Sequence, residues 1–222
     1  FYKYFRPKVD ELMARHGFEY APHLFNTEVH KRKKLEPDVI IYAKPMTNGQ
    51  QTIYINYRDI YKDGEYSNLC LEWYLSDKEV ERIYLHELDN IILTYGETEK
   101  KQLIAGGGAN IEYYLTQMWY HTSPTGRYKT ETEIEALLAY WDQKLREVSW
   151  IDTYDDVEAY IAANLEEIGR LHLRIVISYL RGVKDLIAEK EEWLRTYQMV
   201  GREEELLEKS VSYLINKQKE ES

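Results

Sequence analysis

The 222-residue chain has little of what marks secreted and membrane proteins: it has one cysteine, Cys70, and no long apolar run. A single cysteine excludes an internal disulfide and is typical of a reducing compartment, which predicts a cytoplasmic protein. A membrane-spanning helix needs about 18 or more consecutive apolar residues, and the mean hydropathy of −0.61 agrees with their absence. Residues 1–6 also lack the apolar core of a signal peptide. We therefore expect no contact with a membrane.

Signatures of catalysis and of phosphate binding are missing as well. The sequence contains neither G-x-S-x-G nor S-x-x-K, and neither G-x-G-x-x-G nor a Walker lysine–serine pair. The zinc motif H-E-x-x-H begins at His86-Glu87 but fails, because position 90 is Asn90. Three glycines at residues 106–108 are more typical of a loop than of a phosphate site. We expect no catalytic residue, no metal and no cofactor.

Positive charge is in short supply. The chain holds 29 Lys and Arg against 39 Asp and Glu, a formal net charge of −10. Affinity for nucleic acid comes mainly from neutralising phosphates, so this balance argues against a general nucleic-acid-binding protein. The one basic run, residues 30–34, is interpreted as a solvated strand end and loop.

Two hairpin signals stand close together in the first third of the chain. Asn48-Gly49 joins residues 39–45 to residues 52–57, and Asp63-Gly64 joins the latter to residues 69–75. Both dipeptides favour the positive φ angles that tight hairpin turns need. The pattern predicts an antiparallel β-meander.

Alternation along these strands gives the predicted sheet one apolar and one polar face. Leu71 and Trp73 belong to the apolar face, where we expect the core and burial of Trp73. The polar face is rich in tyrosine, a residue that occurs 21 times in the chain against four phenylalanines. A compositional bias of the source genome would give the same excess, but tyrosine is also favoured in interfaces. The predicted binding residues on this face are Tyr54, Arg58, Glu72 and Tyr74. Two other interpretations of the same face are that a C-terminal helix covers it, or that it is simply solvated.

Helices are predicted on both sides of the meander. Residues 7–16 read as an N-terminal helix with Pro7 in its first turn and Gly17 after its end. Residues 18–30 fit a first strand, and residues 77–85 a short helix after a capping box at 76–79. Residues 111–120 fit either a helix or a strand, and we favour a helix, followed by a loop at residues 121–129.

The second half of the chain predicts helices alone. Apolar stripes run through residues 130–148, 153–182, 184–197 and 203–216. The first stripe includes Trp141, which we expect to be buried, and the second has a candidate helix break near Gly169. The fold class is therefore α+β, with an N-terminal helix, an antiparallel β-meander and an all-helical C-terminal half. We place the sheet region at residues 1–125 and the helical region at residues 126–222, packed together as one unit.

Several segments resemble an uncharacterised group of bacterial α+β proteins, classed as a domain of unknown function. They are a helix that closes on His16-Gly17-Phe18, the strand meander, Tyr140-Trp141, and residues 150–161. The resemblance implies a fold outline and kinship with small accessory proteins, including toxin-immunity proteins. The resemblance implies no catalytic residue in this chain.

These observations favour a non-enzymatic protein-interaction or accessory protein, immunity-like, that binds a protein partner. An enzyme with a pocket between sheet and helices is the first alternative, with Arg58, Glu72 or His86 in it. A self-associating helical structural protein, and so a homo-oligomer, is the second, because the last helices carry long apolar stripes.

Overall fold

The structure is a computed structural model. It describes residues 2–22, 39–59, 66–88, 119–122, 127–128, 130–163, 171–197 and 201–221. Contacts between residues divide the chain into two compact units that alternate along the sequence. Unit 1 contains α1 (Tyr2–Arg15), β1 (Glu19–Tyr20), β2 (Val39–Pro45), β3 (Gln50–Asp59), β4 (Tyr66–Ser76), β5 (Trp119–Thr122), β6 (Arg127–Tyr128) and α6 (Glu131–Val148). Unit 2 contains α3 (Lys78–Glu81), the π-helix η2 (Arg82–Glu87), α7 (Tyr154–Ala163), α8 (Leu171–Leu180), α9 (Leu186–Tyr197) and α10 (Arg202–Glu220).

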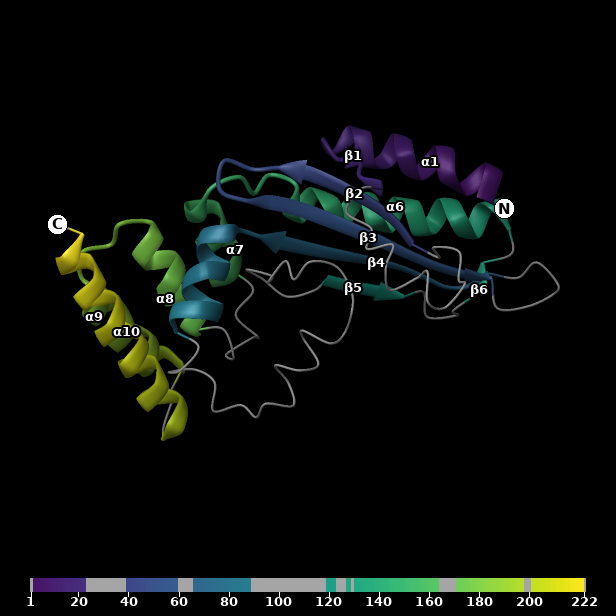
Figure 1. The fold of residues 1–222 in the computed structure, drawn as a ribbon. Coiled ribbons are helices and arrows are strands. Elements are labelled where there is room, and N and C mark those ends of the chain that lie inside the picture. Colours follow the sequence, from purple (N-terminus) through teal and green to yellow (C-terminus); the bar gives the residue numbers. More distant parts are fainter. Residues whose placement is uncertain are drawn as a thin grey trace, which may run out of the picture. The chain divides into compact units, whose positions relative to one another are not determined.

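The strands of unit 1 form one antiparallel sheet in the order β1-β2-β3-β4-β5, with β6 also paired to β4 (Figure 1). The predicted α+β fold with a meander and a helical C-terminal half is confirmed. At the first hairpin, Gly49 has a φ of 92° and its carbonyl accepts from the Met46 amide at 3.0 Å. The second turn, Asp63-Gly64, lies outside the described residues, but β3 and β4 on either side of it pair as predicted.

The core of unit 1 lies on the predicted apolar face. Ile53 is paired with Trp73 on one side and with Tyr42 on the other, and all three side chains are buried. The Trp73 indole donates to the Gln51 side chain at 3.0 Å, and Gln51 donates to the Ile151 carbonyl at 2.6 Å. A buried polar group needs such a partner, so this chain of two bonds makes Gln51 compatible with the core.

Helix α1 is longer than predicted: it begins at Tyr2, so Pro7 lies inside the helix and not in its first turn. Proline removes one helical hydrogen bond, but the added first turn places Phe5 edge-on against Trp141 of α6, with ring centroids 6.2 Å apart. Burial of both rings favours the longer helix. The end of α1 is as expected: Gly17 has a φ of 79°, and Phe18 donates to the Met13 carbonyl at 3.0 Å.

The preference for a helix over residues 111–120 is wrong at its end, where Trp119 and Tyr120 begin β5. These two residues pair with Trp73 and Glu72 of β4, so the free edge of the sheet outweighs a local apolar spacing that suits both structures. Residues 111–118 lie outside the described part. The predicted loop that followed, residues 121–129, also contributes strand residues to β5 and β6.

The first strand is shorter than predicted, since β1 holds two residues and Pro22 lies outside it. Residues 23–30 are not described, and neither is the predicted helix break near Gly169. Helix α6 begins with the expected capping box of Thr130 and Glu133. The short helix after β4 is confirmed, although its cap is Asp77 and not the preceding serine.

The two compact units differ from the predicted division at residues 125 and 126. Helix α6 belongs with the sheet, whereas α3 and η2 belong with the C-terminal helices. The contacts of α6 with α1, and of α3 and η2 with α8, account for this grouping. Packing of the two regions as one body stays a prediction.

Candidate functional site

The predicted binding face is found on the sheet by its strand register. Tyr54 lies opposite Glu72, and Thr52 lies opposite Tyr74, so these residues share one face. A bulge separates them from Arg58, which is paired with Ser67. The side chains of Arg58, Glu72 and Tyr74 are outside the described part of the structure.

This face is not uniformly open. Ile41 and Thr52 both belong to it, and both are buried, while Tyr54, which lies opposite Ile41, is only partly exposed. The face is therefore interior along this stretch, as expected of a second layer of core. Binding by the four predicted residues stays a prediction.

A more exposed aromatic group lies at the edge of the sheet. Tyr20 of β1 is 53% exposed, and the Arg6 guanidinium carbon lies 4.1 Å from the centroid of its ring. The Tyr42 ring meets Tyr20 edge-on at 6.0 Å, and its hydroxyl donates to Asp10 at 2.7 Å. Asp10 also accepts from Arg6 at 2.8 Å, one helical turn away. The four residues form what we call the Arg6–Tyr20 cluster.

The backbone of Tyr20 points outward too. The Ala21 amide donates to the Ile41 carbonyl at 2.8 Å, so the alternation of an antiparallel ladder turns the amide and carbonyl of Tyr20 away from β2. Pro22, which has no amide hydrogen, limits how far another strand can extend this edge. The groups available for binding at this edge are therefore mainly the Tyr20 ring and the Arg6 guanidinium, which Asp10 holds in place.

A serine, a histidine and an aspartate meet elsewhere in unit 1. His16 lies with Nε2 2.9 Å from Asp142 and Nδ1 3.2 Å from the Ser149 hydroxyl. The hydrogen bond with His16, and next the one with Arg146, hold the pKa of Asp142 below its usual value. Arg146 binds the same carboxylate at 2.5 Å and Arg15 approaches it at 3.6 Å.

This trio has the composition of a catalytic triad but not its surroundings. In a catalytic triad the aspartate stabilises a protonated histidine, but here the Asp142 carboxylate also pairs with two arginines. His16 is only 10% exposed, which limits access to a substrate. Lys44 also donates to the Ser149 carbonyl at 2.5 Å. The trio links the C-terminal ends of α1 and α6, so we interpret it as a structural clasp.

Of the His86-Glu87-Leu88-Asp89 segment in unit 2, the structure describes the side chains of Glu87 and Leu88. Its described polar member, Glu87, accepts from Tyr213 at 3.0 Å and lies 3.1 Å from Lys217. In the part of the chain that the structure describes, no three His, Cys, Asp or Glu side chains gather as metal ligands. Among the same residues, no helix has the length and apolar character to cross a membrane.

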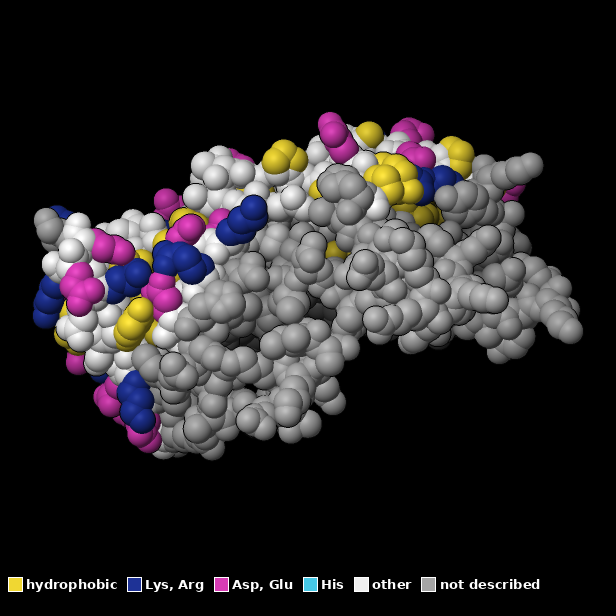
Figure 2. Space-filling model, viewed as in Figure 1, with side chains coloured by type: hydrophobic (Ala, Val, Ile, Leu, Met, Phe, Trp, Pro, Cys, Tyr) yellow, Lys and Arg dark blue, Asp and Glu magenta, His cyan; other side chains and the backbone are white. Residues whose placement is uncertain are grey.

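The surface of unit 2 is mixed in charge. Figure 2 shows lysine and arginine side chains interspersed with aspartate and glutamate over α9 and α10. Its one large exposed apolar side chain among the described residues is Ile187, at 48%. A surface of this kind is typical of solvated helices and does not mark a docking patch.

Comparisons of the chain with known protein families, with curated proteins and with solved structures found no match. The resemblance to a bacterial family of unknown function therefore stays a prediction. The sequence reasoning missed the Arg6–Tyr20 cluster, because its members are separated along the chain and lie on three elements. The available signal was the four-residue spacing of Arg6 and Asp10.

Proposed function

We propose that this protein is a non-enzymatic protein-binding protein of the accessory kind, and that unit 1 contacts its partner through the Arg6–Tyr20 cluster. The observation that carries the proposal is the exposed Tyr20 ring, stacked on an arginine that is itself fixed by Asp10. Tyrosine and arginine concentrate binding energy in interfaces. A side chain that is already ordered loses less entropy on binding, which favours affinity.

The alternatives have less support. An enzyme would need an accessible nucleophile or base, and the Ser149–His16–Asp142 clasp offers little access. Self-association through the last helices would need an uncovered apolar stripe, but Leu207, Val211 and Leu214 of α10 are buried. An immunity-like role rests on the family resemblance and is part of the proposal only as one kind of accessory function.

A site-specific crosslink tests the contact directly. The protein is produced with the photoreactive residue benzoylphenylalanine in place of Tyr20, and is irradiated in a lysate of its source organism. The matched control carries the same residue in place of Trp150, which is also in unit 1 and is 49% exposed. We expect a discrete crosslinked protein from position 20 that position 150 does not give.

The captured protein is then purified and its affinity measured. Because hot-spot tyrosines contribute about 2 kcal/mol or more, Tyr20→Ala should weaken binding by roughly thirtyfold. Arg6→Ala should weaken it less, and Trp150→Ala should leave it unchanged. Equal crosslinking from both positions, or an unchanged dissociation constant for Tyr20→Ala, would reject the proposed surface.

A further inference from the structure

The η2 segment of unit 2 is wound as a π-helix. The Leu88 amide donates to the Ile83 carbonyl at 2.9 Å, five residues back. An α-helix would direct the same amide to Tyr84, four residues back. π-Helical turns are rare and need a specific stabilising contact.

The π-helical winding determines which side chains enter the core. Val80, Ile83 and Leu88 are all fully buried. Residues five apart on an α-helix point about 140° away from each other, so Leu88 could not share the face of Ile83 in that form. The five-residue hydrogen bond places them one above the other.

Glu87 is also held by a contact with a residue five positions earlier in the chain. It pairs with Arg82, five residues earlier, and accepts from Tyr213 at 3.0 Å and Lys217 at 3.1 Å of α10. Arg82 is 45% exposed, so its ion pair is screened by solvent and contributes little. Tyr213 and Lys217 are more enclosed, and we assign most of the hold on Glu87 to them.

Both contacts from α10 come from hydrogen-bond donors. Burial, and next the hydrogen bond with Glu87, raises the pKa of Tyr213, which keeps its hydroxyl a donor. The hydrogen bond with Glu87 raises the pKa of Lys217. The end of α10 is tied down further by Gln218, which donates to the Val183 carbonyl at 2.9 Å, and by Glu221, which accepts from Tyr179 at 2.5 Å.

We propose that docking of α10 sets the winding of η2: Tyr213 and Lys217 hold Glu87 in the position that the π-helix gives it. Release of these two contacts returns the segment to α-helical hydrogen bonding and rotates Leu88 away from Ile83. The C-terminal helix is thus coupled to the backbone state of a segment more than a hundred residues earlier in the chain. The device is independent of the Arg6–Tyr20 cluster.

Scalar couplings across hydrogen bonds, measured by NMR on the deuterated 222-residue chain, identify the acceptor of the Leu88 amide. In the unmodified protein we expect a coupling to the Ile83 carbonyl. In the double variant Tyr213→Phe, Lys217→Met we expect this coupling to be replaced by one to Tyr84. The Leu88 amide should also exchange with solvent about tenfold faster, which corresponds to about 1.4 kcal/mol of local stability.

Lys209→Met is the matched control, because Lys209 also belongs to α10 but pairs with Glu205 within that helix. It should leave the Leu88 coupling unchanged. The single variant Lys217→Met gives a milder perturbation that retains the fold. Persistence of the Ile83 coupling in both Lys217 variants would overturn the proposal, as would an equal change in Lys209→Met.

Discussion

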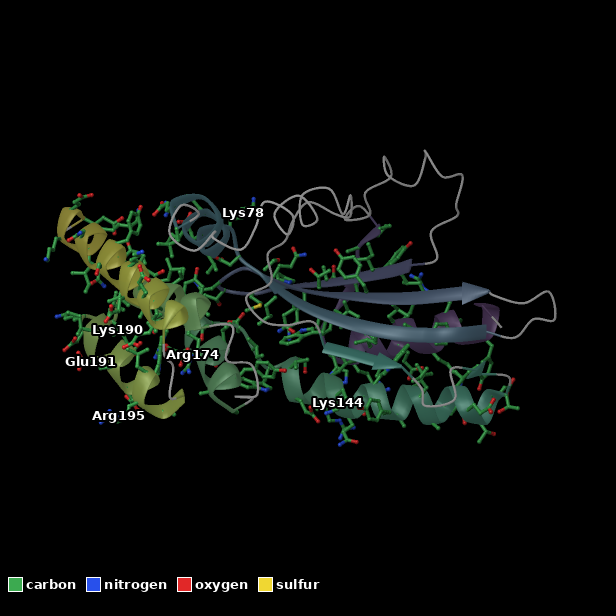
Figure 3. All side chains as sticks on the ribbon, turned by 90° about the horizontal axis from the view of Figure 1, so that it is seen from below. Lys78, Lys144, Arg174, Lys190, Glu191 and Arg195 are labelled. Carbon is green, nitrogen blue, oxygen red and sulfur yellow. The ribbon has the colours of Figure 1, made fainter. Side chains whose placement is uncertain are left out.

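The most deeply buried contacts of the two units differ in kind. In unit 1 the central contacts are apolar or neutral, as in Trp73, Ile53 and the Gln51 amide that bridges to Ile151. In unit 2 charged side chains enter the interior: Arg174 of α8 is buried, pairs with Glu158 of α7 and lies 4.4 Å from the Trp193 ring of α9. Figure 3 shows Arg174 on α8 beside α9.

This difference has a physical consequence. Burial of apolar area depends on the volume and fit of the side chains, whereas a buried ion pair is stable only when both of its charges are present. The core of unit 1 around Trp73 should therefore respond most to changes in side-chain volume, and the Arg174–Glu158 pair of unit 2 to changes in charge.

Trp73→Ala is expected to have the largest effect. It removes the largest side chain from the centre of the sheet and leaves Gln51 without its donor, so it should lower the free energy of unfolding by about 3–5 kcal/mol. Urea denaturation followed by circular dichroism measures this. Trp150→Ala, at an exposed position, is the control and should change stability by less than about 0.5 kcal/mol. A loss below about 1 kcal/mol for Trp73→Ala would show that this face is not the core.

Arg174→Met tests the other half of the comparison. It leaves Glu158, whose side chain is 15% exposed, without its cation, and should cost about 2–3 kcal/mol. The double variant Arg174→Met, Glu158→Gln should recover part of that loss. If the single and double variants were equally stable, burial of an unpaired charge would not be the cause.

The sequence was sufficient for the parts of the fold that local chemistry determines. Asn48-Gly49 predicts a turn because its conformation needs positive φ, and Thr130 with Glu133 predicts a helix start because both bond to the same turn. Alternation in β3 and β4 then identified Trp73 as core. In each case the decisive interaction joins residues close together along the chain or directly across a hairpin.

Distant contacts account for what was missed. The first turn of α1 depends on Phe5 meeting Trp141, and β5 depends on the open edge of β4. The π-helical winding depends on Lys217, which no local pattern reveals. The predicted site stays a prediction for a related reason: alternation distinguishes two faces of a sheet but does not say what covers each of them, and Thr52 is buried on the polar one.

Acid should weaken the clasp between α1 and α6 by a smaller amount. The pKa of Asp142 is lowered in the folded protein, chiefly by His16, so its contribution is complete above its unfolded value of about 4 and is lost as pH falls through the folded value. Asp142→Asn should cost about 1 kcal/mol at neutral pH and should flatten the decline of stability between about pH 4 and pH 2. Thermal unfolding measured across this range tests both, and an unchanged slope would mean that other carboxylates dominate.

Tyr20→Ala should have the smallest effect on folding, because its ring is half exposed and contacts Arg6 and the edge of Tyr42 at the surface of the sheet. A cation–π contact of this kind contributes about 0.5–1 kcal/mol, and the bond of Arg6 to Asp10 remains after the ring is removed. Denaturation of Tyr20→Ala should therefore give a stability within about 1 kcal/mol of the unmodified protein, while its affinity for the captured partner falls. Tyr42→Phe is the informative control, since it removes the bond to Asp10 but keeps the Tyr20 ring. If Tyr20→Ala lost as much stability as Trp73→Ala, the ring would belong to the core and the weakened binding would be a consequence of unfolding.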